Sequence, residues 1–222
     1  MKNILLFSTG LSPQVMTESI YYHTQVRKPA MQIDGIHVIT DGKCAPIIVE
    51  ELLPVNKGWL KRLAEDYHID PETLRLPSEN IHILKDNSGK PLMDLLTVEE
   101  NQAAIETVFH VIRKLTSDPN VRLITSVAGG RKSMSVIVGQ AMQFYAKKQD
   151  VLTHVIIDDR LIGLKEFYYP PPQTKIVTIK GENIDLNKVK IHLDEIPFIR
   201  LRPILGEFIH SNSDTSLISL VE

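Results

Sequence analysis

The chain has 222 residues, of which 43% are hydrophobic and 23% charged, which is typical of a globular protein with a large core. Its formal net charge of −2 excludes a broad positive field that would attract long DNA or RNA. The single cysteine, Cys44, excludes an internal disulfide and a cysteine-rich zinc site, and we interpret it as a small buried hydrophobic residue. No apolar run approaches the roughly 20 residues of a membrane span, so we expect a cytoplasmic protein without membrane contact.

From the N-terminus, short apolar runs alternate with helical patterns. The first run ends at Thr9-Gly10, and Ser12 is expected to cap a helix that has Pro13 in its first turn. A break is expected near Pro54, and Thr97 is expected to cap a long amphipathic helix. The expected strands are residues 3–8, 33–40, 80–84, 121–127 and 151–157, and the expected helices are 12–26, 45–67, 98–117 and 131–148.

This alternation predicts an α/β fold, a Rossmann-like doubly wound parallel sheet. After Asp159 the pattern changes to short strand-like pieces separated by prolines and a glycine. We therefore predict a Rossmann-like domain at 1–159 and a β-rich C-terminal extension at 160–222 that packs on the same domain. Within the extension, strands are expected at 167–169, 175–179, 189–193 and 198–205, and the polar segment 211–216 is expected to be loose.

Two unusual loops are predicted to meet and form the functional site. With the strand order 3-2-1-4-5, the ligand crevice lies at the carboxyl ends of strands 1 and 4. The loops there are residues 9–14 (TGLSPQ) and 126–133 (SVAGGRKS), and each leads into a helix N-terminus, which suits anions. Arg131 and Lys132 oppose the helix dipole, so a bound anion would offset them; the alternative is that both point into water.

Known phosphate-binding motifs do not account for these loops. The dinucleotide fingerprint is absent because Gly10 has no glycine two residues further on. A Walker P-loop has glycine directly before its lysine, where this chain has Arg131. Phosphate binding stays open, whereas NAD binding and NTP hydrolysis by these motifs are disfavoured.

The two loops resemble the signature loops of the CRISPR-associated Rossmann-fold (CARF) proteins, and in particular the stand-alone group similar to ring nucleases. The matching segments are residues 9–18 (TGLSPQVMTE) and 126–134 (SVAGGRKSM). Residues 167–171 (FYYPP) and 196–202 (IPFIRLR) also resemble that group's C-terminal segments. The resemblance implies a homodimer that binds cyclic oligoadenylate, the messenger of type III CRISPR systems, across its two-fold axis. Some members cut the ring without a metal.

At the matching positions, the resemblance implies that Ser12 and Lys132 lie at the scissile phosphate, with Arg131 as the alternative cation. The reaction would be attack by a ribose 2′-OH on the adjacent phosphate, giving a 2′,3′-cyclic phosphate, with cyclic tetra-adenylate favoured over hexa-adenylate. No metal and no cofactor are expected. Ligand contacts are expected from both loops and from the turn after the second strand: Thr9, Gly10, Gln14, Thr17, Ala128, Gly129, Gly130, Ser133 and Asp41.

Several alternatives stay open at this stage. The protein could be a sensor that binds the messenger without cutting it, or an unrelated nucleotide-binding Rossmann protein. No histidine lies in either loop, so cleavage is expected to be slow, since a good general base adds roughly 10²–10⁴-fold. Asp158-Asp159 could bind a metal but is interpreted as a solvated or capping pair, and Arg200 and Arg202 could face a phosphate or a partner subunit.

Overall fold

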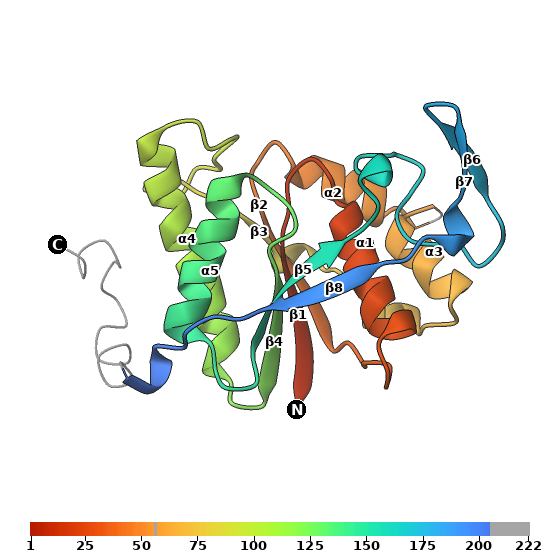
Figure 1. Ribbon diagram of the computed structural model, residues 1–222. Helices are drawn as coiled ribbons and strands as arrows, with labels where there is room; N and C mark the ends of the chain where they lie inside the picture. Colours follow the sequence, from red (N-terminus) through yellow and green to blue (C-terminus); the bar gives the residue numbers. More distant parts are fainter. Residues whose placement is uncertain (56, 205–222) are drawn as a thin grey trace.

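The structure, a computed structural model, describes residues 1–55 and 57–204 (Figure 1). Its centre is a six-stranded sheet in the order β3-β2-β1-β4-β5-β8, and β6 and β7 form a separate hairpin. Within these residues no helix has the length and apolarity needed to span a membrane. The strands are β1 (Lys2–Ser8), β2 (Gly35–Thr40), β3 (Ile81–Ile83), β4 (Val121–Ser126), β5 (Val151–Ile156), β6 (Ile176–Ile179), β7 (Glu182–Asp185) and β8 (His192–Ile196). The helices are α1 (Gln14–Tyr21), α2 (Ala45–Leu52), α3 (Trp59–Asp66), α4 (Val98–Ser117) and α5 (Lys132–Tyr145).

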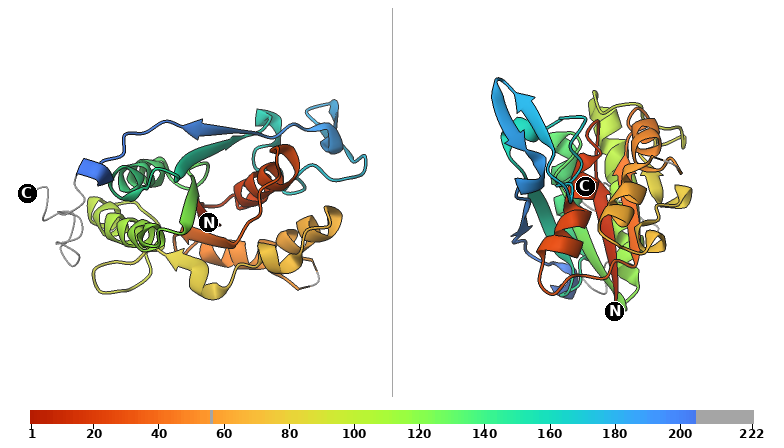
Figure 2. Two further views of the ribbon diagram at one scale, coloured as in Figure 1. Left: turned by 90° about the horizontal axis from the view of Figure 1, so that it is seen from below. Right: turned by 90° about the vertical axis from the view of Figure 1, so that its right-hand side faces the viewer.

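Helices cover both faces of the sheet. Successive side chains of β1 point to opposite faces, so this one strand contacts the helices on both sides. Leu6 points to one face and packs in the core cluster built with α4 and α5. Leu5 and Phe7 point to the other face and pack with Met16 and Ile20 of α1. Figure 2 shows α4 and α5 on one side of the sheet, with α1 and α3 on the other. The predicted doubly wound α/β fold is therefore confirmed.

The predicted strand order 3-2-1-4-5 is also confirmed, and these five strands are parallel. The sequence pattern did not predict that a sixth strand joins this sheet. β8 pairs with β5 in the antiparallel direction, with Leu152 opposite Ile196, so part of the C-terminal region extends the central sheet. Within β8 only Leu193 and Ile196 are partly buried, and this spacing of three does not give the alternation typical of a strand.

The other C-terminal strand predictions need correction, apart from residues 175–179, which contain β6. Residues 167–169 form no strand: Phe167, Tyr168 and Tyr169 are all buried, and Tyr168 stacks on Trp59 at 4.2 Å between ring centroids. The strand expected at 189–193 lies at His192–Ile196 instead. Residues 198–201 are not extended in a sheet, because Pro197 offers no N–H for pairing, and 202–204 are helical. Residue 205 and the segment 211–216 lie outside the described residues.

Several helix boundaries differ from the prediction. Ser12 does not cap α1, since Pro13 occupies the N-cap position and no side chain caps the helix. The first helix continues as a π-helical turn over Tyr22–Val26. The predicted break near Pro54 is confirmed, as α2 ends at Leu52 and α3 begins at Trp59. The Thr97 cap is confirmed as a capping box in which Thr97 and Glu100 exchange hydrogen bonds.

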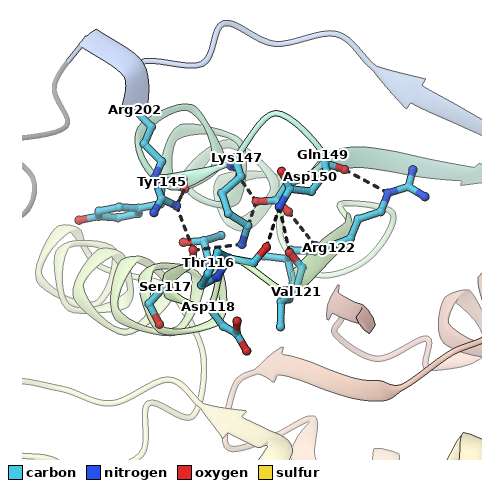
Figure 3. Close-up of polar contacts among 12 residues, drawn as sticks. Thr116, Ser117, Asp118, Val121, Arg122, Tyr145, Lys147, Gln149, Asp150 and Arg202 are labelled. Atoms are coloured by element: carbon cyan, nitrogen blue, oxygen red, sulfur yellow. Dashed lines mark hydrogen bonds and ion pairs between the residues drawn. The ribbon is translucent and has the colours of Figure 1, made fainter. Parts of the chain in front are cut away.

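A buried polar network closes the amino ends of β4 and β5 (Figure 3). Asp150 is fully buried and accepts the N–H groups of Leu123 at 2.8 Å and Lys147 at 2.7 Å. The bond to Lys147 ends α5 before residue 148, where the helix was expected to end. Arg202 donates to the carbonyls of Thr116 and Tyr145, both at 2.9 Å.

This network also corrects the expectation for the two C-terminal arginines. Arg200 donates to the carbonyls of Lys147 and Asp150, at 3.1 and 2.6 Å. Arg200 and Arg202 therefore bind the chain's own backbone at the sheet end opposite the two signature loops. Within this chain their role is to fasten the segment after β8 to the central sheet.

Candidate functional site

The two loops predicted to converge do so, because β1 and β4 are neighbouring parallel strands. The hydroxyl of Ser8 donates to the carbonyl of Gly129 at 3.4 Å. A Cβ atom on Gly10 would lie 3.1 Å from the Cα of Gly130, and one on Gly129 would lie 3.0 Å from the carbonyl oxygen of Ser8. Gly130 also has a φ of +87°, which disfavours other residues. The glycines are therefore needed for the close approach of the loops.

A cavity of about 600 Å³ opens where the loops meet. This size is typical of a small-molecule site and fits one nucleotide unit with room to spare. It lies at the carboxyl ends of the strands, at the switch point between β1 and β4. Its lining comes from the first loop and α1 (residues 10–12, 14, 15 and 18), the β2 turn (41, 43 and 44), Asp94, the second loop (128–131), and the end of β5 with the segment after it (154–157, 159, 162 and 163).

Two helix N-termini border this cavity without side-chain caps. Pro13 is the N-cap residue of α1 and Arg131 that of α5, and neither helix receives a capping hydrogen bond from a side chain. Within the described part of the chain, the N–H groups of Gly129 and Gly130 have no acceptor. Free N–H groups and the positive end of a helix dipole together form an anion-binding site. The cavity is therefore suited to a phosphate.

The charges around the cavity differ from the sequence-based interpretation. Arg131 binds Asp94 through two hydrogen bonds, of 2.5 Å from Nε and 2.7 Å from Nη2, and this ion pair lowers the pKa of the Asp94 carboxyl to about 2. The positive charge of Arg131 is thus balanced by a carboxylate of the protein itself. Lys132 is exposed, has no side-chain partner among the described residues, and is not part of the cavity lining.

The hydroxyl residues predicted at the site fall into two groups. Ser12 lines the cavity and its hydroxyl makes no bond within the described chain. Thr9 and Thr17 are buried instead: Thr9 donates to the Ser12 carbonyl at 3.1 Å, and Thr17 donates to the Tyr168 carbonyl at 2.6 Å. Ser133 is half-buried and outside the lining. The structure therefore brings together Ser12, Gly10, Gln14, Asp41, Ala128, Gly129, Gly130 and Arg131, but not Thr9, Thr17, Lys132 or Ser133.

The sequence interpretation missed several lining residues, of which Glu18 is the most unusual. Glu18 is 3% exposed, and burial raises the pKa of its carboxyl to about 8. It lies four residues after Gln14 on α1, so the two side chains share one helix face. That spacing was the available signal, because a glutamate on the core-facing side of a helix is rare unless paired.

Other polar residues at the cavity are held by the protein. Asp41 accepts the N–H of Cys44 at 2.7 Å, which confirms a turn that also lines the cavity. Burial and the neighbouring Asp41 raise the pKa of the Cys44 thiol to about 12, so this buried thiol is a poor nucleophile. Asp158 caps the short helix after β5 by accepting the N–H of Arg160, as expected of a capping pair.

The chain is thus a doubly wound α/β protein with an anion-suited cavity at its switch point. It belongs to the CRISPR-associated protein NE0113 family, whose model matches residues 12–220. Among solved structures, it is similar to Enterococcus italicus Csm6 bound to cyclic hexa-2′-fluoro-hexa-dAMP, at 15% identity and a TM-score of 0.38. That match covers 70% of this chain and 34% of the other, so the chain spans about a third of that protein. No curated protein matches the sequence.

Proposed function

We propose that this protein binds cyclic oligoadenylate at a homodimer interface and cleaves it as a metal-independent ring nuclease. The observation that carries the proposal is that two uncapped helix N-termini, each led by one of the loops that resemble CARF signature loops, border one cavity. Membership of a CRISPR-associated family supports a ligand from type III CRISPR signalling. Cleavage would remove the messenger and end the response.

The proposed reaction uses a nucleophile that the ligand itself carries. The ribose 2′-oxygen attacks the adjacent phosphorus, the bond to the 5′-oxygen breaks, and the products are a 2′,3′-cyclic phosphate and a 5′-OH. The proton of the 2′-OH is transferred to solvent, and the departing 5′-oxygen takes up a proton from solvent. The protein must hold the three reacting atoms in line and stabilise the added negative charge. In this proposal the added charge is stabilised by the N–H groups of Gly129 and Gly130 and by the Lys132 ammonium. The Ser12 hydroxyl forms a hydrogen bond with the phosphate or with the 2′-OH.

A dimer is proposed because one cavity accommodates only part of a ring. A cyclic tetra-adenylate with two-fold symmetry would present equivalent phosphates to two copies of the site. The exposed side chains of Leu11 and Ile162 lie at the cavity rim, 63% and 66% accessible, and would contact the ligand or the second copy. Cyclic hexa-adenylate is the alternative ligand.

The test is cleavage of radiolabelled cyclic tetra-adenylate and, separately, hexa-adenylate, with EDTA present and products separated by chromatography. Linear products that end in a 2′,3′-cyclic phosphate are expected, and the faster substrate gives the ring size. Intact rings after hours at high protein concentration would contradict the nuclease proposal. Sedimentation with and without the ring tests the dimer.

A sensor that binds without cutting is the second candidate, and two observations favour it. Lys132 lies outside the cavity lining, and Arg131 is held by Asp94. A second loop that supplies no free cation to the phosphate would bind it through backbone N–H groups and contribute less to stabilising a phosphorane. Tight binding of an intact ring, with no products in the same assay, would establish this function instead.

A further inference from the structure

On the inner side of α1, two buried polar side chains line the cavity without partners. Gln14 is 9% exposed, and its Oε1 atom is buried and accepts no hydrogen bond. Glu18 is 3% exposed, and its carboxyl has no partner within the described chain. Buried polar groups in proteins are nearly always paired, so two unpaired groups on one cavity wall indicate that something else completes them.

From these groups we infer that Gln14 and Glu18 recognise the adenine base of the bound nucleotide, a role that rests on the proposed function. The Gln14 Oε1 atom accepts a hydrogen bond from the exocyclic amino group. The Glu18 carboxylic acid donates to a ring nitrogen of the same base. Adenine presents this pair, an amino donor beside a nitrogen acceptor, along one edge.

The order of the groups along α1 agrees with this assignment. The free N–H groups that suit the phosphate lie at the first turn of the helix, and Glu18 lies about one turn farther from the loops. A nucleotide bound along the helix would therefore place its phosphate at the loops and its base beside Glu18. The carboxyl stays protonated near neutral pH, because burial raises its pKa to about 8, and only the protonated form donates a hydrogen bond.

Part of the remaining wall is apolar and suits the flat faces of a base. Val15 of α1 and Ile157 after β5 both line the cavity and pack with Ala128 against the same hydrophobic cluster. Val155 also lines the cavity and is 6% exposed. Apolar walls with a few fixed polar groups are the usual composition of a site that selects one ligand. The lining also includes polar side chains, among them Lys43 in the turn after β2 and His154 and Asp159 from the β5 segment.

The test is calorimetric titration with cyclic tetra-adenylate of wild type, Glu18→Leu, Glu18→Gln and Gln14→Ala. Leucine is expected to weaken binding about 10- to 100-fold, the usual effect of one unpaired buried hydrogen-bonding group, and so is alanine at position 14. Glutamine at position 18 keeps a donor and is expected to recover most of the affinity. The matched control is Glu50→Leu, an exposed glutamate on α2.

Melting temperature separates recognition from a structural role. Glu18→Leu is expected to raise the melting temperature while it weakens binding, because it removes an unpaired buried carboxyl. A lower melting temperature, or unchanged affinity in all three variants, would overturn the inference and leave the proposed function standing.

If no ring binds, a second experiment distinguishes failure of the ring-binding proposal from failure of the base-recognition proposal. Wild type is then titrated with AMP and IMP, since hypoxanthine replaces the amino donor with an oxygen acceptor. Preference for AMP by about tenfold, lost in Gln14→Ala, would support base recognition even though the ring-binding proposal had failed. Equal affinity for AMP and IMP, or binding of neither, would overturn base recognition too.

Discussion

The two ends of the parallel sheet differ in the buried polar groups that they hold. At the amino ends, the Asp150 carboxylate accepts two backbone N–H groups, and Arg122 and Arg202 donate to carbonyls (Figure 3). At the carboxyl ends, Gln14 Oε1 and the Glu18 carboxyl have no partner within the described residues. A satisfied network stabilises the fold, whereas unpaired buried groups cost stability. The Asp150 network therefore has a structural role. Gln14 and Glu18 line the cavity, so we expect a ligand to complete them, whereas the unpaired ring nitrogens of His23 lie outside its lining.

The largest expected effect is at the structural end. Asp150→Ala leaves two backbone N–H groups and Lys147 without their buried acceptor, and we expect unfolding to become easier by about 3–5 kcal/mol. Urea denaturation measures this loss. The control is Asp194→Ala, an exposed acid on β8. Ring cleavage per folded molecule should stay at the wild-type rate, and a loss of cleavage greater than the loss of folded protein would contradict the division of roles.

Next in size is a change at the ligand end that spares stability. Lys132→Ala is expected to slow ring cleavage by about 10²–10³-fold, the usual effect of losing one group that stabilises transition-state charge. Its melting temperature should stay unchanged, because the side chain is exposed and unpaired within the described chain. Single-turnover assays give the rate, with Lys148→Ala, an exposed lysine beyond the C-terminal end of α5, as the matched control. Undiminished cleavage would assign the phosphate contact to Arg131 instead.

A smaller effect concerns the pH dependence of stability. The folded state holds a proton on Glu18 up to about pH 8, whereas the unfolded chain releases it near pH 4.5, so stability falls as the pH rises between these values. Glu18→Gln removes this loss, and its gain over wild type should grow from near zero at pH 4 to about 1–4 kcal/mol at pH 8. His23, whose pKa burial lowers to about 4, contributes the opposite trend equally to both proteins. A gain that does not change with pH would contradict the assignment.

The smallest expected effect concerns the ion pair at the cavity rim. Asp94→Asn frees the Arg131 guanidinium and removes one negative charge, so binding of a polyanionic ring should tighten about threefold, as expected of a partly exposed pair. Titrations at two salt concentrations measure it, and the gain should shrink at high salt. Weaker binding would indicate that Asp94 positions Arg131 for the ligand. Asp159→Asn is the control, since Asp159 also lines the cavity but forms no ion pair among the described residues.

Local patterns in the sequence were enough to predict the central sheet and the place of the site. The alternating apolar runs and helical periods predicted the five strands, because both repeats arise from neighbouring residues, and the doubly wound class that they indicate predicted the parallel order. The glycines at positions 10, 129 and 130 marked the loops, since only glycine permits so close an approach of two backbones.

Contacts between distant segments were decided only by the tertiary structure. Asp94 pairs with Arg131 across 37 residues, and Thr17 turns into the core to bond the Tyr168 carbonyl. Arg200 and Arg202 end in the amino-end network, and β8 joins the sheet as an antiparallel edge. No local period encodes such partners, because each depends on which surfaces the packed sheet brings together. The sequence by itself determined where the two loops meet and the cavity opens, and the tertiary structure decided which side chains line that cavity.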